Sequence, residues 1–75
     1  MNHSLQKIIL NTLIQLTQGT NNEVKLTAIS ILGDYKYAIQ NEETLNRLIE
    51  LCFDPNKEVA ITALKSLGKL SIHFQ

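Results

Sequence analysis

The pattern of hydrophobic and polar positions along the chain occurs twice, as an internal duplication. Residues 10–35 align with residues 45–70 at a constant offset of 35, without a gap, and 12 of the 26 aligned positions are identical. Each copy holds two stretches in which apolar residues recur every three to four positions, the spacing of an amphipathic helix. A period of about 20 to 50 residues is typical of stacked supersecondary units. The sequence therefore predicts two tandem helix-turn-helix units.

The first unit is expected to span about residues 4–35 and to contain two helices. Ser4 is the predicted N-cap of the first helix, whose apolar stripe is too broad for a helix with one packing partner. Thr20, followed by Glu23, has the pattern of a capping box and would open the second helix. Gly33 is the predicted point at which that helix breaks or loosens. The second helix is expected to use as its core face Val24, Ala28, Ile31, Leu32 and Tyr35.

The second unit is expected to span about residues 41–73. Asn41 is the predicted cap of its first helix, and the two glutamates that follow complement the helix dipole. Asp54 before Pro55 predicts the N-cap and first turn of its second helix, because proline lacks only an N–H that is unpaired there. The expected apolar side of the first helix is Leu45, Leu48, Ile49, Leu51 and Cys52. The expected core face of the second helix is Val59, Ala63, Leu64, Leu67 and Leu70.

The second helix of each unit carries a recurring set of residues, with Glu-Val near its start, Ala four residues after the Val, and Leu-Gly at eight and nine. These are Glu23, Val24, Ala28, Leu32 and Gly33, and then Glu58, Val59, Ala63, Leu67 and Gly68. The pattern resembles HEAT-like repeats of the kind found in phycobilin lyase subunits and many bacterial scaffold proteins. The resemblance implies an all-α fold of two tandem repeats, a four-helix short α-solenoid with a right-handed superhelix.

The sequence departs from the family pattern at the positions that can link neighbouring repeats by ion pairs. The family often has a basic residue directly after the Val and an Asp before the second helix. Only Lys25 and Asp54 correspond here, whereas Ala60 and Gly19 occupy the companion positions. Such a ladder of charges between the repeats is therefore expected to be incomplete.

Composition and charge limit the classes of function. The 75 residues allow one domain, residues 1–75, and their 44% hydrophobic content favours a packed helical core. Seven basic and seven acidic residues cancel, so no net field attracts nucleic acid or an anionic membrane. No apolar run approaches the length of a membrane span. Cys52 is the only cysteine, which excludes an intramolecular disulfide and predicts a reducing compartment, with the cytoplasm as the expected localisation.

No residue pattern indicates catalysis, a metal or a cofactor. His3 and His73 lie at opposite ends of the chain, away from any ligand cluster. Glu42 and Glu43 are adjacent on a helix, so their side chains diverge and cannot form an acid/base pair. The glycines are isolated and form no phosphate-binding loop. We therefore expect a protein that is not an enzyme and that uses no metal or cofactor.

The resemblance implies a recognition surface on the second helices of the two units. The candidate contact residues are Thr27, Ser30, Asp34, Tyr37, Ile61, Thr62, Lys65 and Lys69. An ordinary solvated face is the competing interpretation of the polar members. Because the chain has two repeats and solenoids generally need three or more, some apolar surface is expected to stay exposed. The alternative is a compact four-helix monomer whose first and fourth helices fold over one another.

The leading functional hypothesis is a non-enzymatic protein–protein interaction or scaffold module. It would bind a protein partner, or a second copy as a homodimer, through the second helices or an exposed end. Nucleic-acid binding is an alternative that the neutral net charge disfavours, and the observation behind it is the four lysines Lys25, Lys57, Lys65 and Lys69. A further alternative, which rests on the family resemblance alone, is an accessory subunit in bilin chromophore attachment.

Overall fold

The protein folds into helices alone over the part of the chain that its computed structural model describes, residues 3–74 with the side chains of residues 4–73. The elements are α1 (His3–Leu16), α2 (Asn22–Asp34), the 3₁₀ helix η1 (Lys36–Gln40), α3 (Glu42–Leu51), α4 (Lys57–Ser71) and the 3₁₀ helix η2 (Ile72–Phe74). The predicted all-α fold with two pairs of helices is confirmed.

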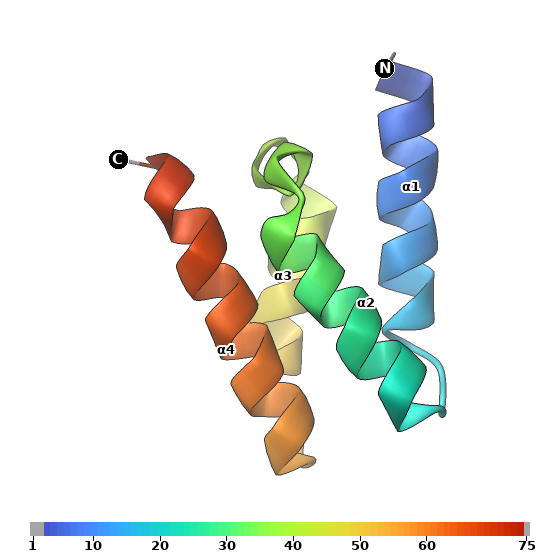
Figure 1. The fold of residues 1–75 in the computed structure, drawn as a ribbon, viewed down its shortest axis with the longest axis vertical. Coiled ribbons are helices and arrows are strands. Elements are labelled where there is room, and N and C mark those ends of the chain that lie inside the picture. Colours follow the sequence, from blue (N-terminus) through green and yellow to red (C-terminus); the bar gives the residue numbers. More distant parts are fainter. Residues whose placement is uncertain (1–2, 75) are drawn as a thin grey trace.

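The helix pairs stack side by side in two layers. Figure 1 shows α2 between α1 and α4, with α3 behind them, and the molecule measures 35 × 28 × 16 Å. Helix α2 packs against both α1 and α4, and α3 packs against α4. Because α1 and α4 lie on opposite sides of α2, they do not fold over one another. The alternative of a compact bundle closed by these two helices is therefore wrong.

The hydrophobic core runs between the two pairs and takes residues from all four helices. Its largest fully buried apolar side chains are Ile29, Leu32, Leu48, Leu51, Val59 and Leu70. Four predicted core residues are exposed instead, namely Val24, Ile31, Ile49 and Leu64. They lie on the sides of the helices that face away from the other repeat. In α2 the buried arc includes Ile29, which the sequence pattern did not place in the core, because α2 has α4 on that side.

Three helices begin at asparagine caps. The Asn41 side chain accepts a hydrogen bond from Thr44 N at 2.8 Å, which confirms the predicted cap of α3. Helix α2 is capped by Asn21, which accepts from Val24 N at 3.1 Å, so the predicted Thr20–Glu23 capping box is wrong. Helix α4 is capped by Asn56 rather than by Asp54.

The reason for the shift at α4 is visible in the hydrogen bonds of the turn. Asp54 Oδ1 accepts from Asn56 N at 2.8 Å, and this local bond orients Asn56. Asn56 Oδ1 then accepts from Glu58 N at 2.9 Å and from Val59 N at 3.2 Å, which satisfies two N–H groups of the first turn. At the start of the chain, α1 begins at His3, so Ser4 lies inside its first turn and is not the cap.

Gly33 does not break α2, which continues to Asp34. Its role is to let α4 approach. A Cβ atom built on Gly33 would lie 2.7 Å from Ser66 Cα, closer than real Cβ contacts allow. Ser66 Oγ also donates a hydrogen bond to the carbonyl of Ile29 at 2.7 Å. This close approach fixes where the two repeats cross.

Another polar link between the repeats involves the single arginine of the sequence. Arg47 on α3 donates from Nε to Thr17 Oγ1 and from Nη2 to Thr17 O, both at 3.0 Å. Thr17 is fully buried directly after α1. Neither Lys25 nor Asp54 forms an ion pair between the repeats within residues 4–73. The family-type ladder is absent there, and Arg47 connects the first helices instead.

Candidate interaction surface

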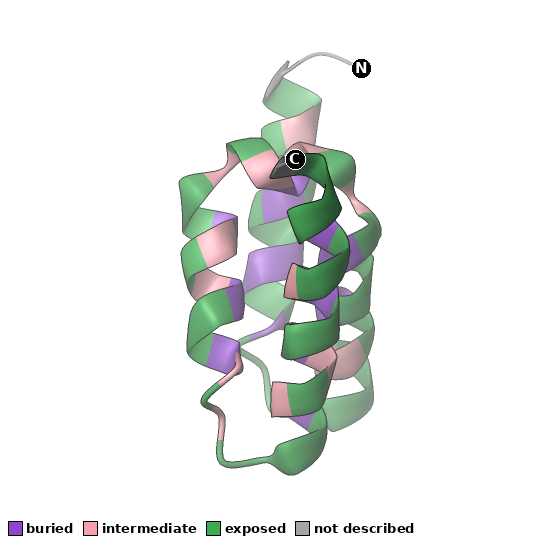
Figure 2. Cartoon of the chain, turned by 90° about the vertical axis from the view of Figure 1, so that its left-hand side faces the viewer, coloured by how far each residue is buried: buried purple, intermediate pink, exposed green. Residues whose placement is uncertain are grey.

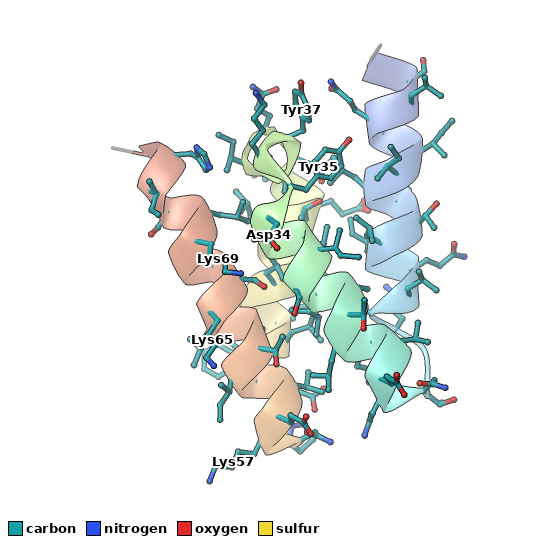
Figure 3. All side chains as sticks on the ribbon, viewed as in Figure 1. Asp34, Tyr35, Tyr37, Lys57, Lys65 and Lys69 are labelled. Atoms are coloured by element: carbon teal, nitrogen blue, oxygen red, sulfur yellow. The ribbon has the colours of Figure 1, made fainter. Side chains whose placement is uncertain are left out.

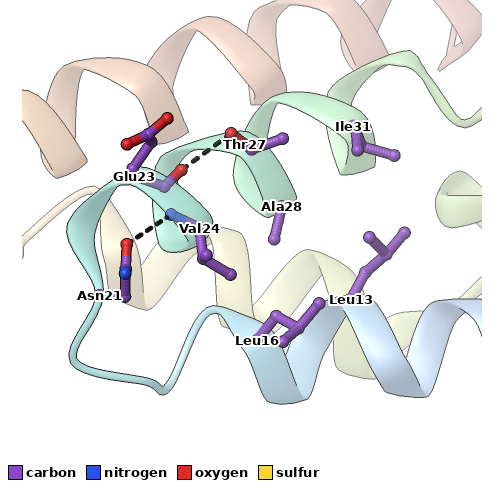
Figure 4. Close-up of a pocket in the computed structure, with 8 residues that line it drawn as sticks. All are labelled: Leu13, Leu16, Asn21, Glu23, Val24, Thr27, Ala28 and Ile31. Carbon is purple, nitrogen blue, oxygen red and sulfur yellow. Dashed lines mark hydrogen bonds between the residues drawn. The ribbon is translucent and has the colours of Figure 1, made fainter.

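An open groove lies between α1 and α2 at the end of the stack that faces away from the second repeat. Its volume is about 420 Å³. We call it the α1/α2 groove, and its lining residues are Leu13, Leu16, Asn21, Glu23, Val24, Thr27, Ala28 and Ile31. Figure 4 shows Leu13 and Leu16 on α1 pointing toward Val24 and Ala28 on α2. The floor of the groove is therefore aliphatic.

The polar residues at the rim of the groove are engaged within α2. Asn21 accepts from the backbone of Val24, and Thr27 Oγ1 donates to Glu23 O at 2.8 Å (Figure 4). These bonds belong to the cap and first turns of α2. A second shallow apolar surface, lined by Ile9, Ile31, Asp34 and Tyr35, adjoins the groove through Ile31. The apolar strip thus continues along α1 and α2.

The duplication explains why this apolar surface is open. Val24 is 43% exposed, whereas its counterpart Val59 in the second repeat is 1% exposed. Leu16 is 42% exposed, whereas its counterpart Leu51 is 2% exposed. The residues of the second repeat are covered by the first repeat, whereas no described residue covers the first repeat in the same way. Within the described part of the chain, the α1/α2 groove is therefore a repeat-packing face on which no repeat is packed.

Of the predicted recognition residues on α2 and α4, Asp34 and Lys69 are in direct contact. Asp34 Oδ1 and Lys69 Nζ lie 3.2 Å apart and form an ion pair between the repeats, as Figure 3 shows. Lys65 is exposed on α4, and Ser30 is exposed on α2. Thr62 Oγ1 donates to Glu58 O within its own helix, as Thr27 does in α2. Most polar groups of this face therefore bond within the chain.

Tyr37 and Ile61 are not part of that polar face. Tyr37 is half-buried in η1, and its ring meets the Tyr35 ring edge to face at 5.5 Å between centroids. The Lys36 ammonium lies 5.4 Å from the centre of the Tyr37 ring, within range of a cation–π contact. Figure 3 shows Tyr37 at the η1 end of the molecule, away from Lys65. Ile61 is exposed on α4.

The described residues offer little reactive chemistry. Among the side chains of residues 4–73, no group of three or more His, Cys, Asp or Glu is arranged to hold a metal ion, and the His3 side chain lies outside this range. Burial raises the pKa of the half-buried Cys52 thiol, which lowers its thiolate content. No helix between residues 3 and 74 has both the length and the apolar character to cross a membrane.

The two helix pairs, which are related by the sequence duplication, and their packing through α2 and α4 define an α-helical repeat protein. The family model for HEAT repeats matches residues 10–72, so the chain belongs to the HEAT repeat family. The HEAT-like part of the sequence resemblance is thereby confirmed. No curated protein and no solved structure matches the chain. HEAT repeats are generally scaffolds for protein interactions and are generally non-catalytic.

The α1/α2 groove was not predicted from the sequence. Val24 and Ile31 were assigned to the core, because their helical spacing is that of a buried face. One signal was available in the sequence. An internal unit buries its apolar residues on both sides, whereas an end unit keeps the same residues and lacks one neighbour. The duplicated Val24 and Val59 therefore have the same chemistry and different surroundings.

Proposed function

We propose that this protein is a non-enzymatic protein–protein interaction module and that the α1/α2 groove is its principal binding surface. The observation that carries the proposal is the burial difference between equivalent residues in the two repeats. Leu16 and Val24 are exposed where Leu51 and Val59 are fully covered. Exposed apolar surface of this kind marks sites at which proteins bind one another.

The chemistry of the groove favours a helical partner with an apolar stripe. Each aliphatic side chain that a partner covers contributes about 25 cal/mol per Å² of apolar area removed from water. At the rim, Asn21 Oδ1 and Thr27 Oγ1 are already bonded within α2, so these two atoms keep a hydrogen-bond partner when the groove is covered. Helix-in-groove recognition uses anchors spaced three to four residues apart, which matches a groove between two helices.

The exposed polar face of α2 and α4 supports a secondary role in the same function. Ser30, Lys65 and the Asp34–Lys69 pair offer polar contacts beside the apolar strip. Charged and polar groups at the rim of an interface set orientation and association rate more than affinity. The single half-buried Cys52 supports a reducing compartment, and the cytoplasm is the compartment we propose.

The two alternative functions have less support. Nucleic-acid binding needs unpaired basic groups along one face, and Lys69 is engaged with Asp34. The net charge of the chain is zero. A role in bilin attachment rests on the finer likeness to phycobilin lyase subunits and has no further support in the geometry.

The proposal can be tested by site-specific photo-crosslinking in cells that produce the protein. A benzophenone amino acid at Ile31, inside the groove, is expected to give adducts of discrete mass. Val24→Asp should remove these adducts, because it places a charge on the groove floor. Ile8→Asp is the matched control, since Ile8 is also an exposed aliphatic residue of the first repeat and does not line the groove. Absence of adducts at Ile31, or adducts that survive Val24→Asp, would contradict the proposal.

A further inference from the structure

The opposite end of the stack has its own uncovered face, formed by residues whose counterparts in the first repeat are buried or, for Ile61, half-buried. Ile49 is 49% exposed, whereas its counterpart Ile14 is 6% exposed; Leu64 is 57% exposed, whereas its counterpart Ile29 is fully buried. Figure 2 looks onto α4 and shows this outward side exposed along most of the helix. We call it the repeat-2 outer face, which consists of Ile49, Ile61, Leu64 and Gly68.

The two end faces of the molecule are complementary because each duplicates one side of the contact between the repeats. Inside the chain, Ile29 of repeat 1 shares the core with Leu51 and Val59 of repeat 2, and Gly33 of the same repeat-1 face packs on Ser66. The repeat-2 outer face is the duplicate of this repeat-1 face. The α1/α2 groove is the duplicate of the repeat-2 face in this contact. The contact that joins the repeats can thus be continued from one molecule to the next.

We propose that a second copy of this chain fills the α1/α2 groove, head to tail, by inserting its repeat-2 outer face. This inference rests on the proposed function and names the partner of the same groove. The interface continues the α2–α4 packing already present inside each molecule. Leu64 of one copy takes the place of Ile29, and Val24 of the neighbouring copy takes the place of Val59.

The charges at the junction agree with this register. Asp34 and Lys69 occupy the same position in the two repeats, since they differ by the repeat length of 35 residues. Within the chain they form an ion pair at 3.2 Å. In the head-to-tail stack, Lys69 of one copy stands where Asp34 stood, and Asp34 of the neighbouring copy stands where Lys69 stood. The pair re-forms with opposite charges, whereas two like residues would repel.

The glycines agree as well. Gly33 is packed against Ser66, and its duplicate Gly68 has no atom within 4 Å of an added Cβ. In the stack, Gly68 faces Ile31 of the neighbouring copy, which is the duplicate of Ser66 and lines the groove. Because Gly68, like Gly33, adds no side chain at this crossing, the two backbones can approach one another there.

A contact between two different faces is heterologous, so it produces a chain or a ring of copies rather than a two-fold dimer. This outcome distinguishes the proposal from a two-fold homodimer, which is one of the alternatives that the sequence left open. In a two-fold dimer through the groove alone, the repeat-2 outer face would have no role.

Sedimentation equilibrium of the purified protein over a wide concentration range tests the proposal. The weight-average mass should rise to at least twice that of the monomer at high concentration. Val24→Asp blocks the groove, Leu64→Asp blocks the repeat-2 outer face, and each variant alone should stay monomeric. An equimolar mixture of the two should form a heterodimer and stop there, because one intact groove and one intact outer face remain. Ile8→Asp is the control and should associate as the wild type does.

Circular dichroism checks that each variant keeps its helices, and Leu16→Asp replaces Val24→Asp if the latter unfolds. Three results would overturn the proposal. They are a wild type that is monomeric throughout, a variant mixture that stays monomeric, or a Leu64→Asp protein that associates like the wild type. Groove-dependent adducts with another protein, combined with a monomeric wild type, would reject the second copy as partner and leave the proposed function standing.

Discussion

Gly33 of α2 lies directly against Ser66 of α4, so that a Cβ atom on Gly33 would be 2.6 Å from Ser66 Oγ and 2.7 Å from Ser66 Cα. Both residues are buried, and the Ser66 hydroxyl is bonded to the carbonyl of Ile29. The backbone of α2 at Gly33 therefore lies directly against both the backbone and the side chain of Ser66. The crossing of the two repeats depends on a position where only glycine fits.

Gly33→Ala should destabilise the protein although alanine is the better helix former. Overpacking a tight site costs about 1–3 kcal/mol, and the gain in helix propensity offsets about 1 kcal/mol of that. Gly68→Ala is the matched control at the duplicate position, where an added Cβ meets nothing within 4 Å. It should stabilise the monomer by up to about 1 kcal/mol. Urea denaturation measures both, and equal effects of the two substitutions would contradict the packing role of Gly33.

Arg47→Ala should lower the free energy of unfolding by about 1.5–3 kcal/mol, the range for hydrogen bonds to a charged group. The guanidinium makes two bonds to Thr17, one to the hydroxyl and one to the carbonyl. Arg47→Lys should restore little of the loss, because an ammonium group cannot reproduce this two-pronged geometry. Glu50→Ala is the control, since the exposed Glu50 carboxylate lies 3.7 Å from Arg47 and its loss should cost well under about 1 kcal/mol. Chemical denaturation of the three variants separates the two interactions.

The caps give a prediction at the start of α4. Asn56→Ala should cost about 1 kcal/mol, because its side chain holds two backbone N–H groups of the first turn. Asp54→Ala should cost less, since Asp54 accepts one bond, from Asn56 N. If Asp54→Ala proved the more damaging in thermal denaturation, Asp54 rather than Asn56 would be the effective cap.

A charge inside the helix seam should unfold the chain. Ala63 is fully buried on α4, so Ala63→Asp places a carboxylate where no partner or solvent is available. The native far-ultraviolet dichroism and the cooperative melt should be lost. Leu64→Asp, one residue further along the same helix, should keep the native spectrum because Leu64 is exposed. The pair separates burial from the general effect of aspartate in a helix.

We expect the free energy of unfolding to depend on pH through the Cys52 thiol. Burial raises its pKa in the folded state above the unfolded value of about 8.5. Stability from the protonated thiol is fully present below the unfolded pKa and is lost as pH rises through the folded pKa. The wild type should therefore lose stability above about pH 8.5 relative to Cys52→Ala. Iodoacetamide should also alkylate the folded protein more slowly than the urea-unfolded protein at the same pH. Parallel pH–stability curves for wild type and Cys52→Ala would contradict the raised pKa.

Much of the fold could be predicted from local features. The 35-residue offset predicts two units, and helical spacing predicts the helices. The cap at Asn41 was correctly predicted, because asparagine before two glutamates is a strong start signal. The caps at Asn21 and Asn56 were missed, although they are identical residues at duplicate positions. Several capping residues stand close together in both turns, and local propensity alone does not choose between them.

The candidate site was predicted only in outline. The sequence indicated exposed apolar surface, because two repeats have too few neighbours. It did not indicate which residues form that surface, and it assigned Val24, Ile31, Ile49 and Leu64 to the core. Helical periodicity indicates that one face of a helix is apolar, but the exposure of that face depends on whether another element covers it.

The sequence by itself determined the number of repeats, their helical composition and the family, since duplication and periodicity are properties of neighbouring positions along the chain. Only the tertiary structure decided that Gly33 is a packing point while Gly68 is open, and that Val59 is buried while Val24 lines a groove. These pairs are identical in sequence. They differ because each repeat of a two-repeat stack has a neighbour on one side only, and that asymmetry arises when the helices pack.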